Sequence, residues 1–151
     1  MKKHIAASFI GLSLLALTGC GGGGDAGGTV APVPAVLTAT AAPLSIIKGS
    51  TSIYTFTVSN GNVGALGNVG LSLNFGSNVT ITQLPQFTCS ASNFVYSSSG
   101  TASITFGAVP ASSVCQISVV IQPGATGTFS PSVSTIGNVV LQGSIPLLVV
   151  N

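Results

Sequence analysis

The segment Y-T-F-T-V, residues 54–58, alternates large apolar side chains with threonines. Successive side chains of a β-strand point to opposite faces of the sheet, so Tyr54, Phe56 and Val58 share one face. The same period of two recurs in residues 69–75, 102–106 and 115–121. No convincing helical period occurs from Val36 onward. These patterns predict half-buried antiparallel strands, each with one apolar and one polar face.

Shorter apolar runs between these segments predict further strands, separated by turn residues at intervals of about 8–12 residues. The weaker candidates are residues 36–40, 45–47, 79–82, 94–97, 128–134, 139–142 and 147–150. Turns are indicated by Ser59-Asn60-Gly61-Asn62, Gly76-Ser77-Asn78, Ser98-Ser99-Gly100 and Pro123-Gly124. Together they predict an all-β protein, an Ig-like antiparallel β-sandwich of about seven to nine strands.

Charged side chains make up only 3% of the 151 residues. Lys2 and Lys3 stand at the N-terminus with His4, which leaves Asp25 and Lys48 in the rest of the chain. No basic patch can be assembled from these residues, so a nucleic-acid partner is excluded. Zinc sites need His or Cys and calcium sites need several carboxylates, so we expect no metal and no cofactor.

Catalytic chemistry near neutral pH normally uses His, Asp, Glu or an activated Lys or Cys. In the predicted domain only Lys48 is of this kind, beside two cysteines that we expect to be paired. Lys48 precedes Gly49 between two candidate strands, where a solvated turn lysine is the expectation. The sequence therefore predicts no catalytic residues and a protein that is not an enzyme.

The first seventeen residues have the pattern of a secretory signal. Lys2, Lys3 and His4 precede an uncharged apolar stretch of 13 residues, Ile5 to Leu17. A retained membrane anchor is the alternative, but a helix of this length is short for spanning the hydrocarbon core of a bilayer.

The end of this stretch, Leu17-Thr18-Gly19-Cys20, resembles the lipobox of bacterial lipoproteins at all four positions. The resemblance implies cleavage between Gly19 and Cys20, diacylglycerol on the Cys20 sulfur, and stable attachment by two or three acyl chains. Gly21 stands where an Asp would favour the inner membrane in that family, so the outer membrane is expected. The predicted organisation is a signal peptide (1–19), a lipidated Cys with a Gly/Pro-rich tether (20–35) and the sandwich (36–151).

With Cys20 assigned to lipid, Cys89 and Cys115 remain as an even pair. In an oxidising compartment such a pair is expected to form a disulfide, and two buried free thiols are the alternative.

The region from about Ala42 to Gly127 resembles a conserved repeat domain of unknown function found in bacterial and archaeal surface proteins. The matching features are a strand ending at an Asn-Gly turn, a strand leading to a Pro, and two segments that each contain a Cys. In this sequence they correspond to Tyr54–Gly61, Val79–Pro85, Phe87–Cys89 and Val109–Pro123. The resemblance implies an Ig-like sandwich and no particular activity.

Three functions are compatible with these observations. The first is a lipid-anchored, non-enzymatic cell-envelope module with a structural, adhesive or protein-binding role and an envelope or surface protein as partner. The alternative is a self-assembling subunit that pairs strand edges or donates its C-terminal strand, residues 147–150. The third is an enzyme, or a carbohydrate-binding module that uses Tyr54, Tyr96 or a Phe for stacking. It is disfavoured, because Tyr54 alternates with core residues and a single exposed Tyr without any Trp makes a poor sugar platform.

Overall fold

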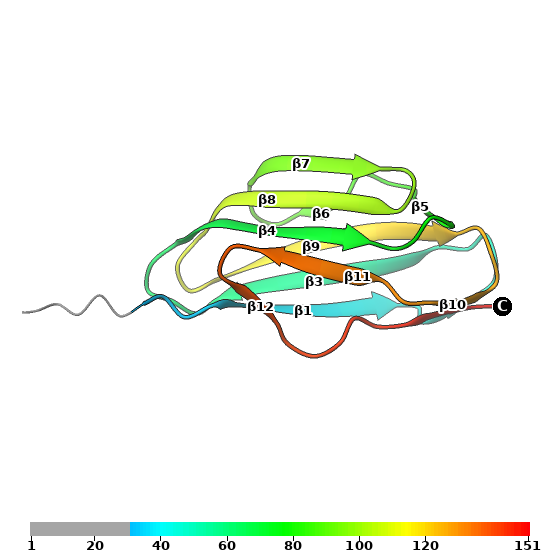
Figure 1. Cartoon of the computed structure of the whole chain (residues 1–151), viewed down its shortest axis with the longest axis horizontal. Coiled ribbons are helices and arrows are strands. Elements are labelled where there is room, and N and C mark those ends of the chain that lie inside the picture. Colours follow the sequence, from blue (N-terminus) through cyan, green and yellow to red (C-terminus); the bar gives the residue numbers. More distant parts are fainter. Residues whose placement is uncertain (1–30) are drawn as a thin grey trace, which may run out of the picture. The chain divides into compact units, whose positions relative to one another are not determined.

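The computed structural model describes residues 31–151, which consist of strands and connecting turns without a helix (Figure 1). The strands are β1 (Ala35–Ala42), β2 (Ser45–Ile46), β3 (Ser52–Asn60), β4 (Leu66–Asn74), β5 (Val79–Ile81), β6 (Gln86–Phe87), β7 (Ala91–Ser97), β8 (Thr101–Val109), β9 (Ser113–Pro123), β10 (Gly127–Phe129), β11 (Ser132–Ile136), β12 (Val139–Leu141) and β13 (Leu148–Val150).

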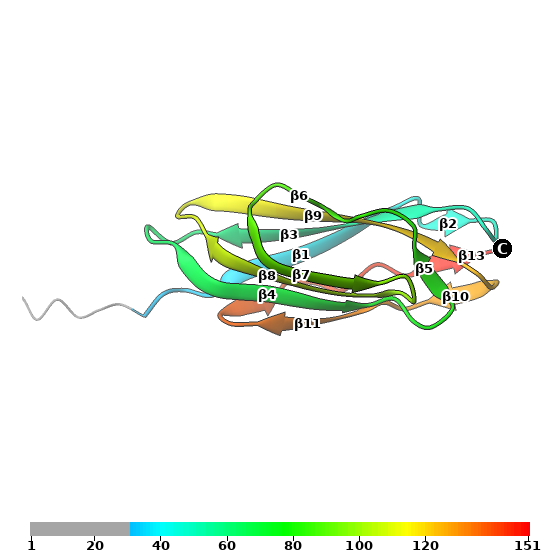
Figure 2. The same cartoon turned by 90° about the horizontal axis from the view of Figure 1, so that it is seen from above.

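Two of the three sheets form the layers of the sandwich. Sheet I has the order β12-β1-β3-β9-β5, with β6 also paired to β9, and sheet II has the order β11-β4-β8-β7. Both views place β11, β4, β8 and β7 in one layer and β1, β3 and β9 in the other (Figures 1 and 2). Sheet III, with the order β10-β13-β2, lies at the end of the domain where the chain finishes.

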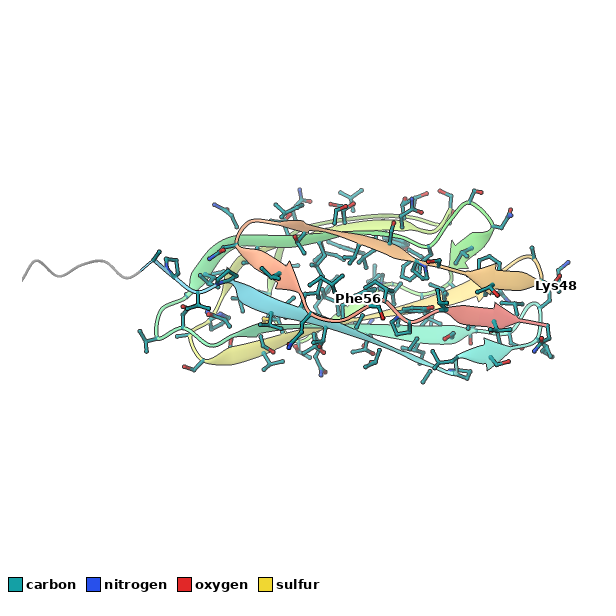
Figure 3. All side chains as sticks on the ribbon, turned by 60° about the horizontal axis from the view of Figure 1, so that its bottom comes forward. Lys48 and Phe56 are labelled. Carbon is teal, nitrogen blue, oxygen red and sulfur yellow. A yellow bond between two sulfur atoms is a disulfide. The ribbon has the colours of Figure 1, made fainter. Side chains whose placement is uncertain are left out.

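The core between the layers follows from the alternation in the sequence. Tyr54, Phe56 and Val58 of β3 are at most 1% exposed, and their neighbours in sheet I and sheet II are buried in the same way. Figure 3 shows Phe56 in the interior between the ribbons. The other members that are fully buried include Leu37, Val69, Leu71, Leu73, Ile104, Phe106, Cys115, Ile117, Val119 and Ile121.

The predicted fold class, an all-β protein whose main sheets pack as a β-sandwich, is confirmed. The count of seven to nine strands is too low, because several short pieces at the margins form strands of two or three residues. Two pairs are parallel, β1 with β12 and β2 with β13. β6 is an additional strand that the sequence did not predict, because its two residues carry no recognisable alternation.

The predicted strand over residues 128–134 is wrong in one respect, because it forms two strands in different sheets. β10 pairs with β13 in sheet III, and β11 pairs with β4 in sheet II. The break falls at Ser130 and Pro131. Proline has no N–H to donate to a ladder, so the chain leaves one sheet at this point and enters another.

Candidate functional site

The residues predicted for signal cleavage and lipidation, Gly19 and Cys20, lie outside the described part of the chain, as does most of the predicted tether. Within residues 31–151 no helix is long and apolar enough to cross a membrane.

Cys89 and Cys115 are joined by a disulfide, with their Cα atoms 5.3 Å apart. Cys115 is fully buried on β9, and Cys89 lies in the segment that leaves β6 for β7. The Thr88 amide donates to the Gln116 carbonyl at 3.1 Å, and the Gln116 amide donates to the Thr88 hydroxyl at 2.7 Å. The disulfide therefore fixes the crossing from sheet I to edge strand β7 of sheet II.

Few ionisable groups are available for chemistry in the described residues. Lys48 is exposed in the turn after β2, at the end of the domain (Figure 3). Tyr96 is 42% exposed on β7, whereas Tyr54 is buried. No group of three or more His, Cys, Asp or Glu residues that could hold a metal is present in residues 31–151.

Tyr54 is buried among apolar residues, and its hydroxyl donates a hydrogen bond to the carbonyl of Pro146 at 2.9 Å. Its ring contacts Phe75 edge to face, with the centroids 5.3 Å apart. Burial disfavours the charged phenolate and raises the pKa of Tyr54 from 10.0 to about 12.

This raised pKa predicts a loss of stability in alkaline solution. Between pH 10 and about 12 the unfolded chain releases the Tyr54 proton while the folded chain keeps it, so the free energy of unfolding falls as pH rises. Urea titrations at pH 9 and at pH 11.5 measure this fall. Tyr54→Phe has no such proton and should lose less stability over the interval; an equal loss in both proteins would contradict the prediction.

Asn60 is the one large polar side chain in the described residues that is almost completely buried, at 2% exposure. Its Nδ2 lies within hydrogen-bond distance of three carbonyl oxygens, those of Gly64 at 3.0 Å, Val109 at 3.1 Å and Pro110 at 2.9 Å. Asn60 therefore links the loop after β3 to the loop between β8 and β9.

The oxygen of Asn60 holds Asn62, and Asn62 in turn holds the chain that leads into β1. Asn60 Oδ1 accepts from the backbone amide of Asn62 at 3.0 Å and from its Nδ2 at 2.8 Å. Asn62 Oδ1 accepts from the Val33 amide at 2.9 Å, and Asn62 Nδ2 donates to the Val33 carbonyl at 2.8 Å. Asn138 Nδ2 donates to the Pro32 carbonyl at 3.0 Å. We call Asn60, Asn62 and Asn138 the tether seat.

In the sequence, Asn60 and Asn62 are marked only as turn residues, and nothing marks Asn138. A signal for Asn60 was present, because the period of two in β3 continues from Tyr54 through Phe56 and Val58 to position 60. An amide at a core position predicts a set of buried partners. The partners themselves are backbone groups of distant loops, which no local pattern reveals.

The outward face of sheet II is uncharged and consists mainly of hydroxyl and amide side chains. Its pairing aligns them in three rows across the four strands, and the middle row is Ser134, Ser72, Ser103 and Val95. A shallow hollow of about 250 Å³ lies over β4, β8 and β7. Its lining residues are Ser72, Val95, Tyr96, Ser97, Thr101, Ala102 and Ser103. This face can form hydrogen bonds but offers no charge to a ligand.

No protein-family model matches the sequence, and no curated protein matches it. Among solved structures, the chain is similar to one described as "AvmM Catalyzes Macrocyclization in Alchivemycin A Biosynthesis". The alignment covers 80% of this chain and 96% of the other, with 12% sequence identity and a TM-score of 0.47. A similarity at this level shows neither a family nor a function for this chain.

The prediction that the protein is not an enzyme is nevertheless corrected by this comparison. The neighbour is described as catalysing a macrocyclization, so a similarity to an enzyme stands against a prediction that rested on the scarcity of ionisable residues. We withdraw that prediction. The similarity assigns no reaction, substrate or catalytic residue to this chain.

Proposed function

We propose that the chain is a lipid-anchored module of the cell envelope, held at the outer membrane through Cys20, with a structural, adhesive or protein-binding role. The observation that carries this proposal is the tether seat. Asn62 holds both backbone polar groups of Val33, and Asn138 holds the carbonyl of Pro32. An exposed, proline-flanked segment is thus bound to the domain just before β1 begins.

The position of the tether seat supports a role in which the domain presents its far end to a partner. The residues leading into β1 lie at one end of the domain, and β2, β10 and β13 lie at the opposite end (Figures 1 and 2). A chain fixed at its point of entry presents the rest of the domain in a restricted range of orientations. The far end bears Lys48 and the exposed side chains of Leu44 and Ile47.

The surface composition also supports attachment to a membrane. Lys48 is the one charged side chain among residues 31–151. Net charge normally keeps a freely diffusing domain dispersed, and this domain has little. A domain that is anchored to a membrane does not depend on net charge to stay dispersed in solution. A partner for such a surface would be recognised by hydrogen bonds and shape rather than by charge.

The C-terminal strand is engaged within its own chain. β13 pairs with β10 on one side and with β2 on the other, and Leu148 and Val150 are buried. The hypothesis of a C-terminal strand donated to a neighbour therefore gains no support, and we do not carry it into the proposal.

Cys20→Ser tests the anchor directly. We expect the wild-type chain in the detergent phase of a Triton X-114 partition and in washed membranes, and Cys20→Ser in the aqueous phase, because the acyl chains are the only attachment proposed. Intact mass of the purified wild type should show added diacylglycerol. A Cys20→Ser chain that stays in washed membranes would contradict the proposal and would favour a retained leader helix.

A further inference from the structure

Strand β7 forms an open edge of sheet II. It pairs with β8 on one side and has no strand on the other among residues 31–151 (Figure 1). Within β7, Val95 is 62% exposed and Tyr96 is 42% exposed. An edge strand presents a row of unpaired backbone N–H and C=O groups, which are a template for pairing with another chain.

Proteins usually protect such edges with charges, prolines, bulges or very short strands. Edge strands β5 and β12 are short, with three residues each, and edge strand β11 has five residues and starts directly after Pro131. β7 has seven residues and contains neither a charge nor a proline. Its one irregularity lies between Ala91 and Asn93, which leaves Asn93–Ser97 regular.

We propose that β7 pairs antiparallel with β7 of a second copy of this chain. The register that fits the residues places Val95 opposite Val95 of the second copy. Phe94 then lies opposite Tyr96 on the inward side, and Asn93 lies opposite Ser97 on the outward side. Apolar, aromatic and polar side chains each meet their own kind, and such cross-strand pairs stabilise a sheet.

The aromatic residues of this edge are already arranged for the pairing. Phe94 contacts Phe87 of β6 edge to face at 5.0 Å between centroids, and Tyr96 stacks on Phe94 at 5.3 Å. Phe87 belongs to the segment held by the disulfide, so the inward side of β7 is supported from sheet I. A second copy would add its own Phe94 and Tyr96 to this stack.

The partner follows from symmetry and charge. Pairing of β7 with itself uses the same strand on both copies and closes a two-fold dimer with one continuous eight-stranded sheet. Because β7 is uncharged, no like charges meet across the axis.

A single strand pair buries less surface than a stable interface needs in dilute solution. The inference rests on the proposed anchoring, which concentrates copies on one membrane and favours a weak contact.

Disulfide trapping in membranes tests the pairing. Residues directly opposite in an antiparallel pair have Cα atoms about 4.5–5.5 Å apart, which lies within the range of a disulfide. We expect full-length Val95→Cys to form a covalent dimer under mild oxidation. Val140→Cys is the matched control, since Val140 is a 55% exposed valine on edge strand β12. At least tenfold more dimer with Val95→Cys is expected; equal amounts from both would overturn the proposal.

Two further variants test the register. Asn93→Cys and Ser97→Cys expressed together should form mixed dimers, because these positions face each other across the proposed axis. Either variant alone should give little dimer, because each position is then several residues from its own counterpart. Trapping of a different protein by Val95→Cys would overturn the proposal in favour of a peptide ligand for this edge.

The two proposals can fail separately. The same trapping is measured on Cys20→Ser chains at matched total concentration, where we expect at least a fivefold loss of dimer. Absent dimer in anchored and unanchored Val95→Cys refutes the pairing and leaves the anchor intact. If Val95→Cys gives the same amount of dimer with and without Cys20→Ser, and the Cys20→Ser chains still remain in membranes, the anchor is refuted and the pairing is left intact. Far-ultraviolet circular dichroism and thermal unfolding confirm that each variant is folded.

Discussion

Asn60→Asp should lower the free energy of unfolding by about 3 to 5 kcal/mol at pH 7, the cost of a buried charge that no opposite charge compensates. The side-chain nitrogen of Asn60 lies 2.9 to 3.1 Å from three carbonyl oxygens. A carboxylate would place a negatively charged oxygen against these acceptors and could donate to none of them. Burial at 2% exposure leaves no room for water to compensate.

The pH dependence of the stability of Asn60→Asp shows whether the destabilisation comes from the buried charge or from the changed shape of the side chain. Burial and the facing carbonyl oxygens raise the pKa of the new carboxyl in the folded chain above its ordinary value. The destabilisation is therefore greatest at neutral pH and decreases as pH falls through the raised pKa, where the protonated acid can donate one hydrogen bond. Urea titrations of Asn60→Asp and wild type at pH 7 and pH 4.5 measure this difference.

Asn78→Asp is the matched control for Asn60→Asp. Asn78 is exposed in the turn before β5, and Asp suits a turn as well as Asn does. We expect a change within about 0.5 kcal/mol, as is usual for a surface substitution. A small effect of Asn60→Asp, similar to that of the control, would show that the Asn60 hydrogen bonds contribute little to the fold.

Removal of the disulfide should have the second largest effect. The bond joins residues 26 positions apart in the sequence. In the chain-entropy account, opening a loop of this size lowers the free energy of unfolding by about 3 to 4 kcal/mol. Cys89→Ala with Cys115→Ala should show this loss in urea titrations, with an additional term for apolar volume lost at Cys115, which is fully buried.

Reductant provides the comparison for the double variant. Wild type in dithiothreitol should lose a similar amount of stability, whereas the double variant should be unaffected by dithiothreitol. Hydrogen exchange should rise first in the segment from Thr88 to β7, because the bond holds that segment against β9. A wild-type unfolding midpoint that is unchanged by full reduction would contradict this prediction.

The main strands and the inward face of each could be predicted because a period of two is local. Tyr54, Phe56 and Val58 lie within five residues, and their burial follows from the alternation alone. The parallel pairing of β1 with β12 could not be predicted, since it joins Ala35 to Val139 across most of the domain. Short strands such as β6 are defined by their partner rather than by their own residues.

The candidate site was harder to predict because it, too, depends on contacts between residues that are far apart in the sequence. The disulfide follows from counting cysteines once a compartment is assumed. The tether seat depends on three asparagines meeting backbone groups of Pro32, Val33, Gly64, Val109 and Pro110. Those groups belong to every residue type alike, so no side-chain pattern marks them. The free edge of β7 became visible only when the order of strands in sheet II was known.

The pairing of β1 has a mechanical consequence. A pull on the residues before Val33 is transmitted along β1, which is bonded to β3 over seven residue pairs and to β12 over three. Hydrogen bonds between strands run across the strand direction, so a tensile force on the membrane side loads them in shear, all together rather than one after another. The Asn62 contacts with Val33 would be the first to take the load. These contacts can break and form again, whereas the ladder hydrogen bonds of β1 share the remaining force among them.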